Sequence, residues 1–142
     1  MNEDIKRIFI DTVTTYNYSD KIVEDSVIKE LYELTKWGAT SFNCSPLRLV
    51  FLKSEEAKNR IDPYLMDANK VNVKKAPVCV IIGMDTKFFK DLPKNFKAVD
   101  AKVFFENNEE LAHATAFRNS SLQAGYFLKA VNALGLDAGS MS

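Results

Sequence analysis

The sequence contains few of the residues that build metal centres, disulfide frameworks or membrane spans. It has two cysteines, Cys44 and Cys79, and one histidine, His113. Neither cysteine has metal-ligand spacing, so a zinc site would lack ligands, and free thiols in a reducing cytosol are expected. Residues 1–7 are rich in charge, and no apolar run approaches about 18 residues, so the sequence predicts neither a signal peptide nor a membrane span. We therefore expect a cytoplasmic protein without a metal site.

An excess of charge of either sign is also missing. The 19 basic and 19 acidic side chains cancel, and no long run of lysine or arginine occurs. This balance argues against nucleic acid or an anionic membrane as the main partner and favours a small organic substrate. A chain of 142 residues, 46% of them hydrophobic, is long enough to bury a core. We expect residues 1–142 to form a single domain.

Hydrophobic periodicity predicts several helices and two separated strands. Asn2 can cap a first helix that ends near residues 14–18, and Ser54 can cap a short helix that ends by Pro63. Gly38 is expected to end another helix in the left-handed conformation. The remaining predicted elements are helices 25–37, 66–74 and 108–134 and buried strands 47–53 and 77–83, the second covered on both faces. These elements indicate an α+β or α/β fold.

The longest predicted helix, 108–134, is closed by Gly135 and has two kinds of surface. Its predicted apolar stripe comprises Leu111, Ala114, Phe117, Ser121, Ala124, Leu128 and Val131. Its small residues are Ala112, Ala116, Ser120 and Gly125, and they predict close helix packing and a dimer contact. The aromatic segment 86–102 is predicted to be a surface excursion held by its own side chains, with a lid over a site as the alternative.

Residues 36–51 join a helix end to a strand through small and polar side chains, as ligand-binding loops on rigid frames often do. The loop holds Thr40, Ser41, Asn43, Cys44 and Ser45. Taken alone, its hydroxyl and amide groups are expected to cap the turn's own backbone. Cys44 has no histidine near it in the sequence, so a structural thiol is favoured over a nucleophile.

Two segments of the sequence resemble the nitroreductase family of flavin enzymes. The family signature Pro-Ser-x-x-Asn-x-Gln-Pro-Trp corresponds to residues 39–47, Ala-Thr-Ser-Phe-Asn-Cys-Ser-Pro-Leu. Residues 36–46, together with the later segment Thr-Ala-Phe-Arg-Asn-Ser-Ser at 115–121, are similar to the branch of malonic semialdehyde reductases and NADH dehydrogenase/NAD(P)H nitroreductases.

The resemblance implies an α+β nitroreductase fold, with a central sheet flanked by helices, and an obligate homodimer that holds FMN at the subunit interface. The family continues past the position that corresponds to Ser142. We therefore expect the chain to represent the N-terminal two-thirds of the family domain and to be incomplete at its C-terminus.

The resemblance also implies which residues contact FMN, whose redox chemistry the protein would position and tune. Asn43, with Thr40 and Ser41 beside it, would meet the pyrimidine edge, because its amide offers both a donor and an acceptor. The other implied contacts are Asn69 and Asn72 at the ring, Thr14, Thr15 and Asn17 at the phosphate, and Ser140, Met141 and Ser142 at the isoalloxazine edge.

Two of these positions depart from the family pattern. The family has an arginine where Thr14 stands and a lysine where Asn72 stands, unless Lys70 or Lys74 replaces that lysine. A threonine hydroxyl binds phosphate less well than a guanidinium fork. We expect weakened flavin binding as a result.

The function implied by the resemblance is FMN-dependent NAD(P)H oxidoreduction, with NADH or NADPH as reductant and a small aldehyde, enone, quinone or nitro compound as acceptor. Hydride would pass through flavin N5, and no residue is assigned as a catalytic acid or base. Arg118, and less directly Arg48, could bind a substrate carboxylate, with a structural ion pair as the alternative. The alternative for the whole chain is a truncated, cofactor-free interaction or vestigial protein of the same fold.

Overall fold

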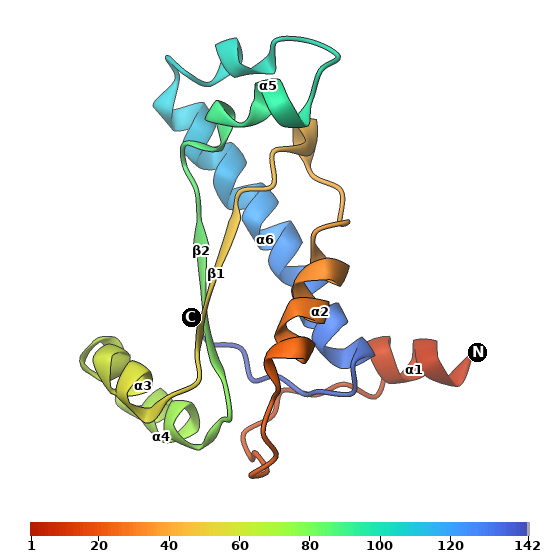
Figure 1. Ribbon diagram of the computed structural model, residues 1–142, viewed down its shortest axis with the longest axis vertical. Helices are drawn as coiled ribbons and strands as arrows, with labels where there is room; N and C mark the ends of the chain where they lie inside the picture. The colour runs from red at the N-terminus through yellow and green to blue at the C-terminus, as the bar shows by residue number, and fades with distance from the viewer. Residues whose placement is uncertain (142) are drawn as a thin grey trace. The chain divides into compact units, whose positions relative to one another are not determined.

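The structure is a computed structural model that describes residues 1–141 (Figure 1). The helices are α1 (Glu3–Phe9), α2 (Asp25–Thr35), α3 (Glu55–Ile61), α4 (Asp67–Lys75), α5 (Leu92–Asn95) and α6 (Glu109–Ala133). The strands are β1 (Leu47–Leu52) and β2 (Cys79–Met84), and four short 3₁₀ turns lie at 41–43, 62–64, 88–90 and 101–104. No described helix is both long and apolar enough to cross a membrane. The predicted α+β class, with several helices and two strands, is confirmed.

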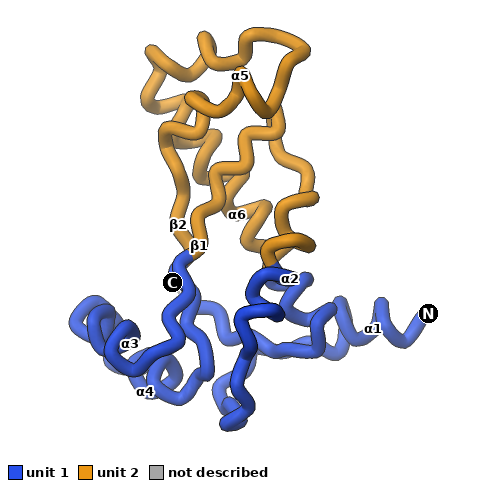
Figure 2. The backbone as a smooth tube through the Cα atoms, in the orientation of Figure 1, with its two compact units in different colours: residues 1–31, 50–81, 128–142 blue, residues 32–49, 82–127 orange. Residues whose placement is uncertain are grey.

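The chain divides into two compact units (Figure 2). The first comprises residues 1–31, 50–81 and 128–142, and the second comprises residues 32–49 and 82–127. Both strands and helices α2 and α6 have residues in each unit.

Three predicted helix caps, two at N-termini and one at a C-terminus, form in the first unit. The Asn2 side chain accepts a hydrogen bond from the Asp4 amide (2.7 Å), and the Ser54 side chain accepts one from the Ala57 amide (3.1 Å). Gly135 takes a φ of 74°, and the bonds from Gly135 and Leu136 to the carbonyls of Asn132 and Val131 form a Schellman cap. These caps depend on neighbouring residues alone, which is why the sequence predicts them.

Helix α1 ends at Phe9, earlier than expected, because none of its residues is buried. Two hydrogen bonds from cationic side chains connect α1 to the end of α6. Arg7 donates from Nη2 to the Ala133 carbonyl (2.8 Å), and Lys129 donates from Nζ to the Ile8 carbonyl (3.0 Å). Each helix therefore has a C-terminal carbonyl capped by the other.

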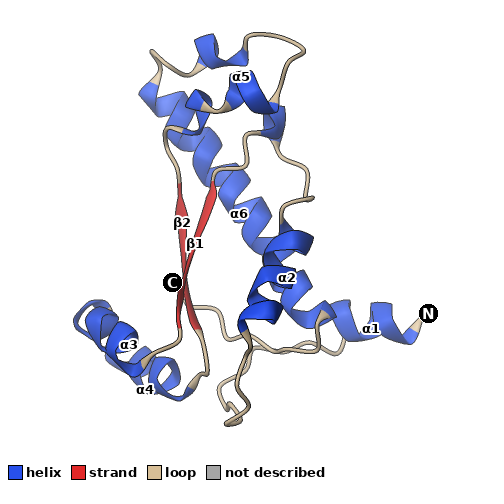
Figure 3. Cartoon of the chain, viewed as in Figure 1, coloured by secondary structure: helices blue, strands red, loops and turns tan. Residues whose placement is uncertain are grey.

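The two strands form a two-stranded sheet and run in opposite directions (Figure 3). Leu52 and Cys79 are buried with Val73, and Ala57, Ile61 and Leu65 pack against them. The prediction that 77–83 is covered on both faces is wrong for the described residues, because Ile81 and Ile82 are exposed. Strand 47–53 is likewise buried only in part, since its side chains alternate between half-buried and exposed positions before Leu52.

The second unit has a core built largely from the segment that was predicted to be a surface excursion. Phe88, Leu92 and Ala101 are each 1% exposed and pack with Cys44 and Phe105. The segment 86–102 is therefore part of the core. The prediction of a surface excursion is wrong, because three of its aliphatic and aromatic side chains pack against Ala112 and Ala116 of α6, and the lid stays a prediction.

Helix α6 buries a different face from the one its apolar residues predict. Leu111 and Phe117 are exposed, whereas the buried positions include Thr115, Asn119 and Gln123. The small residues Ala112, Ala116 and Ser120 are buried inside this chain, Ala116 completely. A dimer contact through those three residues is therefore wrong, although Gly125 remains exposed.

Candidate functional site

The loop that follows α2 has a strained backbone. Phe42, Asn43 and Ser45 have φ values of 52°, 51° and 40°, in the left-handed region that residues with a Cβ seldom occupy. Such conformations persist where surrounding contacts hold them, and they concentrate at functional sites. The Thr40 hydroxyl supplies one contact by accepting a hydrogen bond from the Ser45 amide (3.1 Å).

Two buried amides of α6 hold the loop at both ends. Asn119 Oδ1 accepts a hydrogen bond from the Ser41 amide (2.9 Å), and Gln123 Oε1 accepts one from the Leu47 amide (3.0 Å). Asn119 is fixed in turn, because its Nδ2 donates to the Thr115 carbonyl (2.9 Å). Sequence reasoning missed both residues, although their four-residue spacing on one helix face was the available signal.

A third contact from α6 explains the glycine at position 38. Tyr126 donates its hydroxyl to the Ala39 carbonyl (3.1 Å), and its ring lies where a Cβ on Gly38 would be. Gly38 is not among the described residues with positive φ. The predicted left-handed cap is therefore wrong, and the glycine is needed for the close approach of the ring.

The loop presents Ser41 and Asn43 to the surface. Both are exposed, and Asn43 donates from Nδ2 to the Asn95 carbonyl (3.2 Å). The oxygen Oδ1 of Asn43 has no hydrogen-bond partner among the described residues. The Thr40 hydroxyl instead bonds to the backbone of the turn, which is the capping role predicted for the loop taken alone.

Cys44 belongs to this loop, and its side chain is buried. Burial raises the pKa of its thiol, an effect that hydrogen bonds from Thr40 and from nearby backbone amides only partly oppose. A thiol held in the protonated form is a poor nucleophile. The structure therefore supports the structural role predicted for Cys44.

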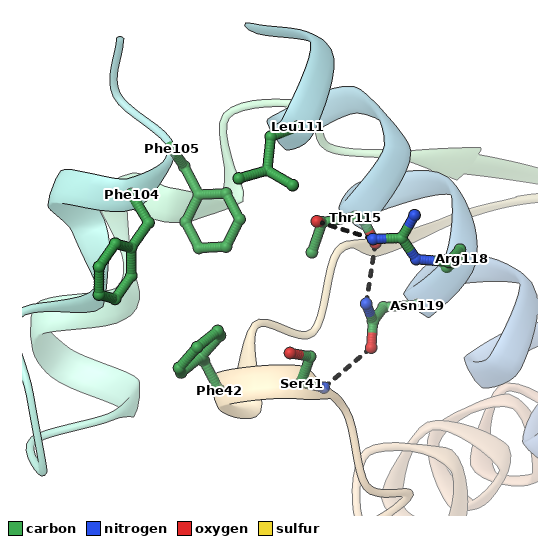
Figure 4. A pocket seen from close by; sticks show the side chains of 8 residues that line it. All are labelled: Ser41, Phe42, Phe104, Phe105, Leu111, Thr115, Arg118 and Asn119. Atoms are coloured by element: carbon green, nitrogen blue, oxygen red, sulfur yellow. Dashed lines mark hydrogen bonds between the residues drawn. The ribbon is translucent and has the colours of Figure 1, made fainter. Parts of the chain in front are cut away.

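A cavity of about 390 Å³ opens beside the loop, within the second unit (Figure 4). Its apolar side is formed by Phe42, Phe104, Phe105 and Leu111. Ser41, Thr115, Arg118 and Asn119 complete the lining. Thr40, Ser41, Asn43 and Arg118 are thus gathered in one unit.

The other predicted site residues lie in the first unit. Thr14 and Asn17 are exposed, and the Thr15 amide donates to the Ala138 carbonyl (3.0 Å). A Cβ on Gly139 would overlap the Thr15 carbonyl oxygen, so residues 14–17 and the segment before Ser140 lie against each other. Met141 and Ser140 are exposed, and Ser142 lies outside the described residues.

Asn69 and Asn72 lie three residues apart on α4 and are half-buried. Both neighbouring lysines form ion pairs with aspartates. Lys70 pairs with Asp67 (2.7 Å), which raises the pKa of Lys70, and Lys74 pairs with Asp62 (3.3 Å). The replacement of the family lysine by Lys70 or Lys74 stays a prediction.

Comparison with known proteins identifies the family. The profile described as "Nitroreductase family" matches residues 12–142. This chain belongs to the nitroreductase family. A Burkholderia lata protein provisionally named NADH dehydrogenase/NAD(P)H nitroreductase is 47% identical over 138 residues, which are 97% of this chain and 71% of that protein.

Solved structures show that the chain has the nitroreductase fold. A provisionally named nitroreductase in complex with FMN, from Exiguobacterium sibiricum, superposes with a TM-score of 0.83 at 20% identity, over 99% of this chain and 73% of that one. An enone reductase of gut-bacterial fatty acid saturation gives a TM-score of 0.86 at 16% identity, over 99% and 76%. A provisionally named nitroreductase from Bacillus subtilis gives 0.85 at 18% identity, over 99% and 75%.

Proposed function

We propose that this nitroreductase chain contributes to an FMN-dependent NAD(P)H oxidoreductase that reduces a small organic acceptor. Family membership and the FMN complex of the Exiguobacterium sibiricum relative support this function. The observation that carries the proposal is the strained loop 40–47, which Asn119 and Gln123 hold while Ser41 and Asn43 stay exposed.

The donors and acceptors of this loop fit the polar edge of a flavin. A flavin pyrimidine edge carries both N–H and carbonyl groups, and Asn43 Oδ1 and the Ser41 hydroxyl can accept and donate the matching hydrogen bonds. Because the loop is fixed by buried contacts, little ordering would be needed on binding. Thr40 would act indirectly by holding the turn that carries the other two.

The first unit offers weaker partners to a phosphate. Thr14, Thr15 and Asn17 supply hydroxyl, amide and backbone N–H groups but no positive charge. Asn69, Asn72, Ser140, Met141 and Ser142 remain proposed ring contacts.

When bound, FMN supplies two-electron chemistry, so that NAD(P)H, a proton and an oxidised acceptor yield NAD(P)⁺ and the acceptor reduced by two electrons.

We further propose that the protein acts in the cytoplasm as a homodimer, with residues 1–142 belonging to one nitroreductase domain. The two free cysteines support a reducing compartment. The exposed side chains of Leu111, Phe117 and Leu122 on α6 support an association through the helix face opposite Ala116.

A titration of the purified chain with FMN tests the cofactor assignment. The Asn43→Leu variant keeps the side-chain volume but removes both polar groups, so binding should weaken by roughly 1 to 3 kcal/mol. Asn59→Leu, on an exposed position of α3, is the matched control and should bind as the parent chain does. Equal affinity of the Asn43→Leu variant and the parent would reject the assignment.

A further inference from the structure

Arg118 is the charged group of the cavity in the second unit. Its guanidinium donates from Nη2 to Thr115 Oγ1 (3.3 Å) and forms no ion pair with any described residue. A guanidinium has five N–H donors in a planar fork that matches a carboxylate. Most of the hydrogen-bonding capacity of Arg118 is therefore left for a ligand.

The other arginine considered for an anion is committed to the protein. Arg48 donates from Nη2 to Asp85 Oδ2 (2.7 Å) and from Nη1 to the carbonyls of Ser45 and Leu47. Its charge is paired with Asp85 and three of its five N–H donors are used, so it braces the end of the loop. Arg118, by contrast, forms one hydrogen bond, to a neutral hydroxyl oxygen, and no ion pair with a described residue.

The remaining walls define the shape of a ligand. The Phe42 ring lies 6.2 Å from that of Phe104, with the planes 35° apart, and 6.1 Å from that of Phe105, edge to face, so that three aromatic rings line the cavity across from Arg118 (Figure 4). Asn119 is occupied by Ser41 and Thr115 and has little to offer a ligand. About 390 Å³ lies within the range of small-molecule pockets.

We propose that this cavity binds the acceptor as a flat, unsaturated carboxylic acid, with the carboxylate on Arg118 and the planar body against Phe42, Phe104 and Phe105. This inference rests on the proposed function for the reduction itself. In that reaction, a nitroarene acid ArNO₂ with NAD(P)H and H⁺ gives ArNO, NAD(P)⁺ and H₂O. The binding of the carboxylate depends on this chain's own residues alone.

The binding test uses benzoate and benzamide, which have nearly the same shape and differ in charge. In ligand-observed NMR with the chain lacking FMN, we expect benzoate to bind and benzamide to bind at least tenfold more weakly. Arg118→Gln should abolish the difference, Arg118→Lys should restore part of it, and Arg60→Gln, an exposed arginine of α3, should leave it unchanged. Equal binding of the two ligands to the parent chain would overturn the inference, even if FMN binds as proposed.

The kinetic test compares 4-nitrobenzoate with 4-nitrobenzamide in the FMN-loaded protein. Losing a charge-assisted hydrogen bond should lower kcat/KM of Arg118→Gln for the acid by about 10- to 100-fold, with less than about a threefold change for the amide. The KM for NAD(P)H should stay constant. An equal loss for acid and amide, or a raised KM for NAD(P)H, would overturn the carboxylate assignment. If no acceptor were reduced while benzoate bound through Arg118, the proposed function would fail and the anion site would stand.

Discussion

At the scale of single residues, Gly38 illustrates a glycine required by a neighbour and not by its own backbone angles. The Tyr126 ring occupies the place of a Cβ at this position. We expect Gly38→Ala to lower the free energy of unfolding by about 1 to 3 kcal/mol, because the ring must shift and strain its surroundings. Gly125→Ala is the control, since a Cβ there meets no atom within 4 Å and should be neutral or stabilising. Denaturant unfolding measures both variants, and equal midpoints would contradict this explanation.

The two buried thiols predict how stability depends on pH. Burial raises the pKa of Cys44 and of Cys79, so the folded protein holds these protons more tightly than the unfolded chain does. Their contribution to stability is complete below the ordinary thiol pKa of about 8.5 and is lost as the pH rises through the raised values. Unfolding free energies measured between pH 7 and pH 10 should therefore fall, and fall less in a Cys44→Ala/Cys79→Ala double variant. Parallel profiles for the two proteins would contradict this prediction.

At the scale of elements, the polar face of α6 controls the loop after α2. Replacing Asn119 with leucine leaves the Ser41 amide without its buried acceptor, at a cost of about 1 to 3 kcal/mol. The variant should lose loop order, seen as faster amide exchange at residues 41–45, while the helix content from circular dichroism stays constant. His113→Leu, on an exposed position of α6, is the control. Protection of the loop amides equal to that of the parent chain would show that the loop is held by other contacts.

The same helix shows what the sequence can and cannot predict. Caps at Asn2, Ser54 and Gly135 depend on neighbouring residues, and all three are confirmed. The buried face of α6 is not local, because Asn119 and Gln123 can enter the interior only where loop amides satisfy them. A pattern based on hydrophobicity places such residues outside.

The candidate site, like α6, has features that the sequence predicts and features that it does not. The family signature locates Thr40, Ser41 and Asn43, and these residues do form a distinct loop beside a cavity. The left-handed angles of Phe42, Asn43 and Ser45 could not be predicted, since no glycine marks them and distant residues impose them. The roles of these residues in flavin binding stay predictions.

At the scale of the whole molecule, the proposed flavin contacts come from parts of the chain that are distant in the sequence. The segment proposed to meet the phosphate has an exposed Thr14, where the resemblance implies an arginine, and Lys70 and Lys74 of α4 are paired with aspartates. We expect Thr14→Arg to tighten FMN binding by roughly tenfold to a hundredfold, the value of a charge-assisted hydrogen bond. Riboflavin, which lacks the phosphate, should bind the variant and the parent equally in fluorescence titrations. A similar gain for riboflavin would place the effect away from the phosphate.

The crossed caps of α1 and α6 have a consequence for synthesis on the ribosome. Arg7 and Ala133 are 126 residues apart, and Ile8 and Lys129 are 121 apart. A seven-residue helix with no buried side chain is too short to persist by itself. At about 5 to 20 residues per second, α1 waits roughly 6 to 25 seconds for the end of α6 to be translated. Helix α1 is thus made before its partner but settles only with it, and its exposed Phe9 is available to a chaperone throughout that interval.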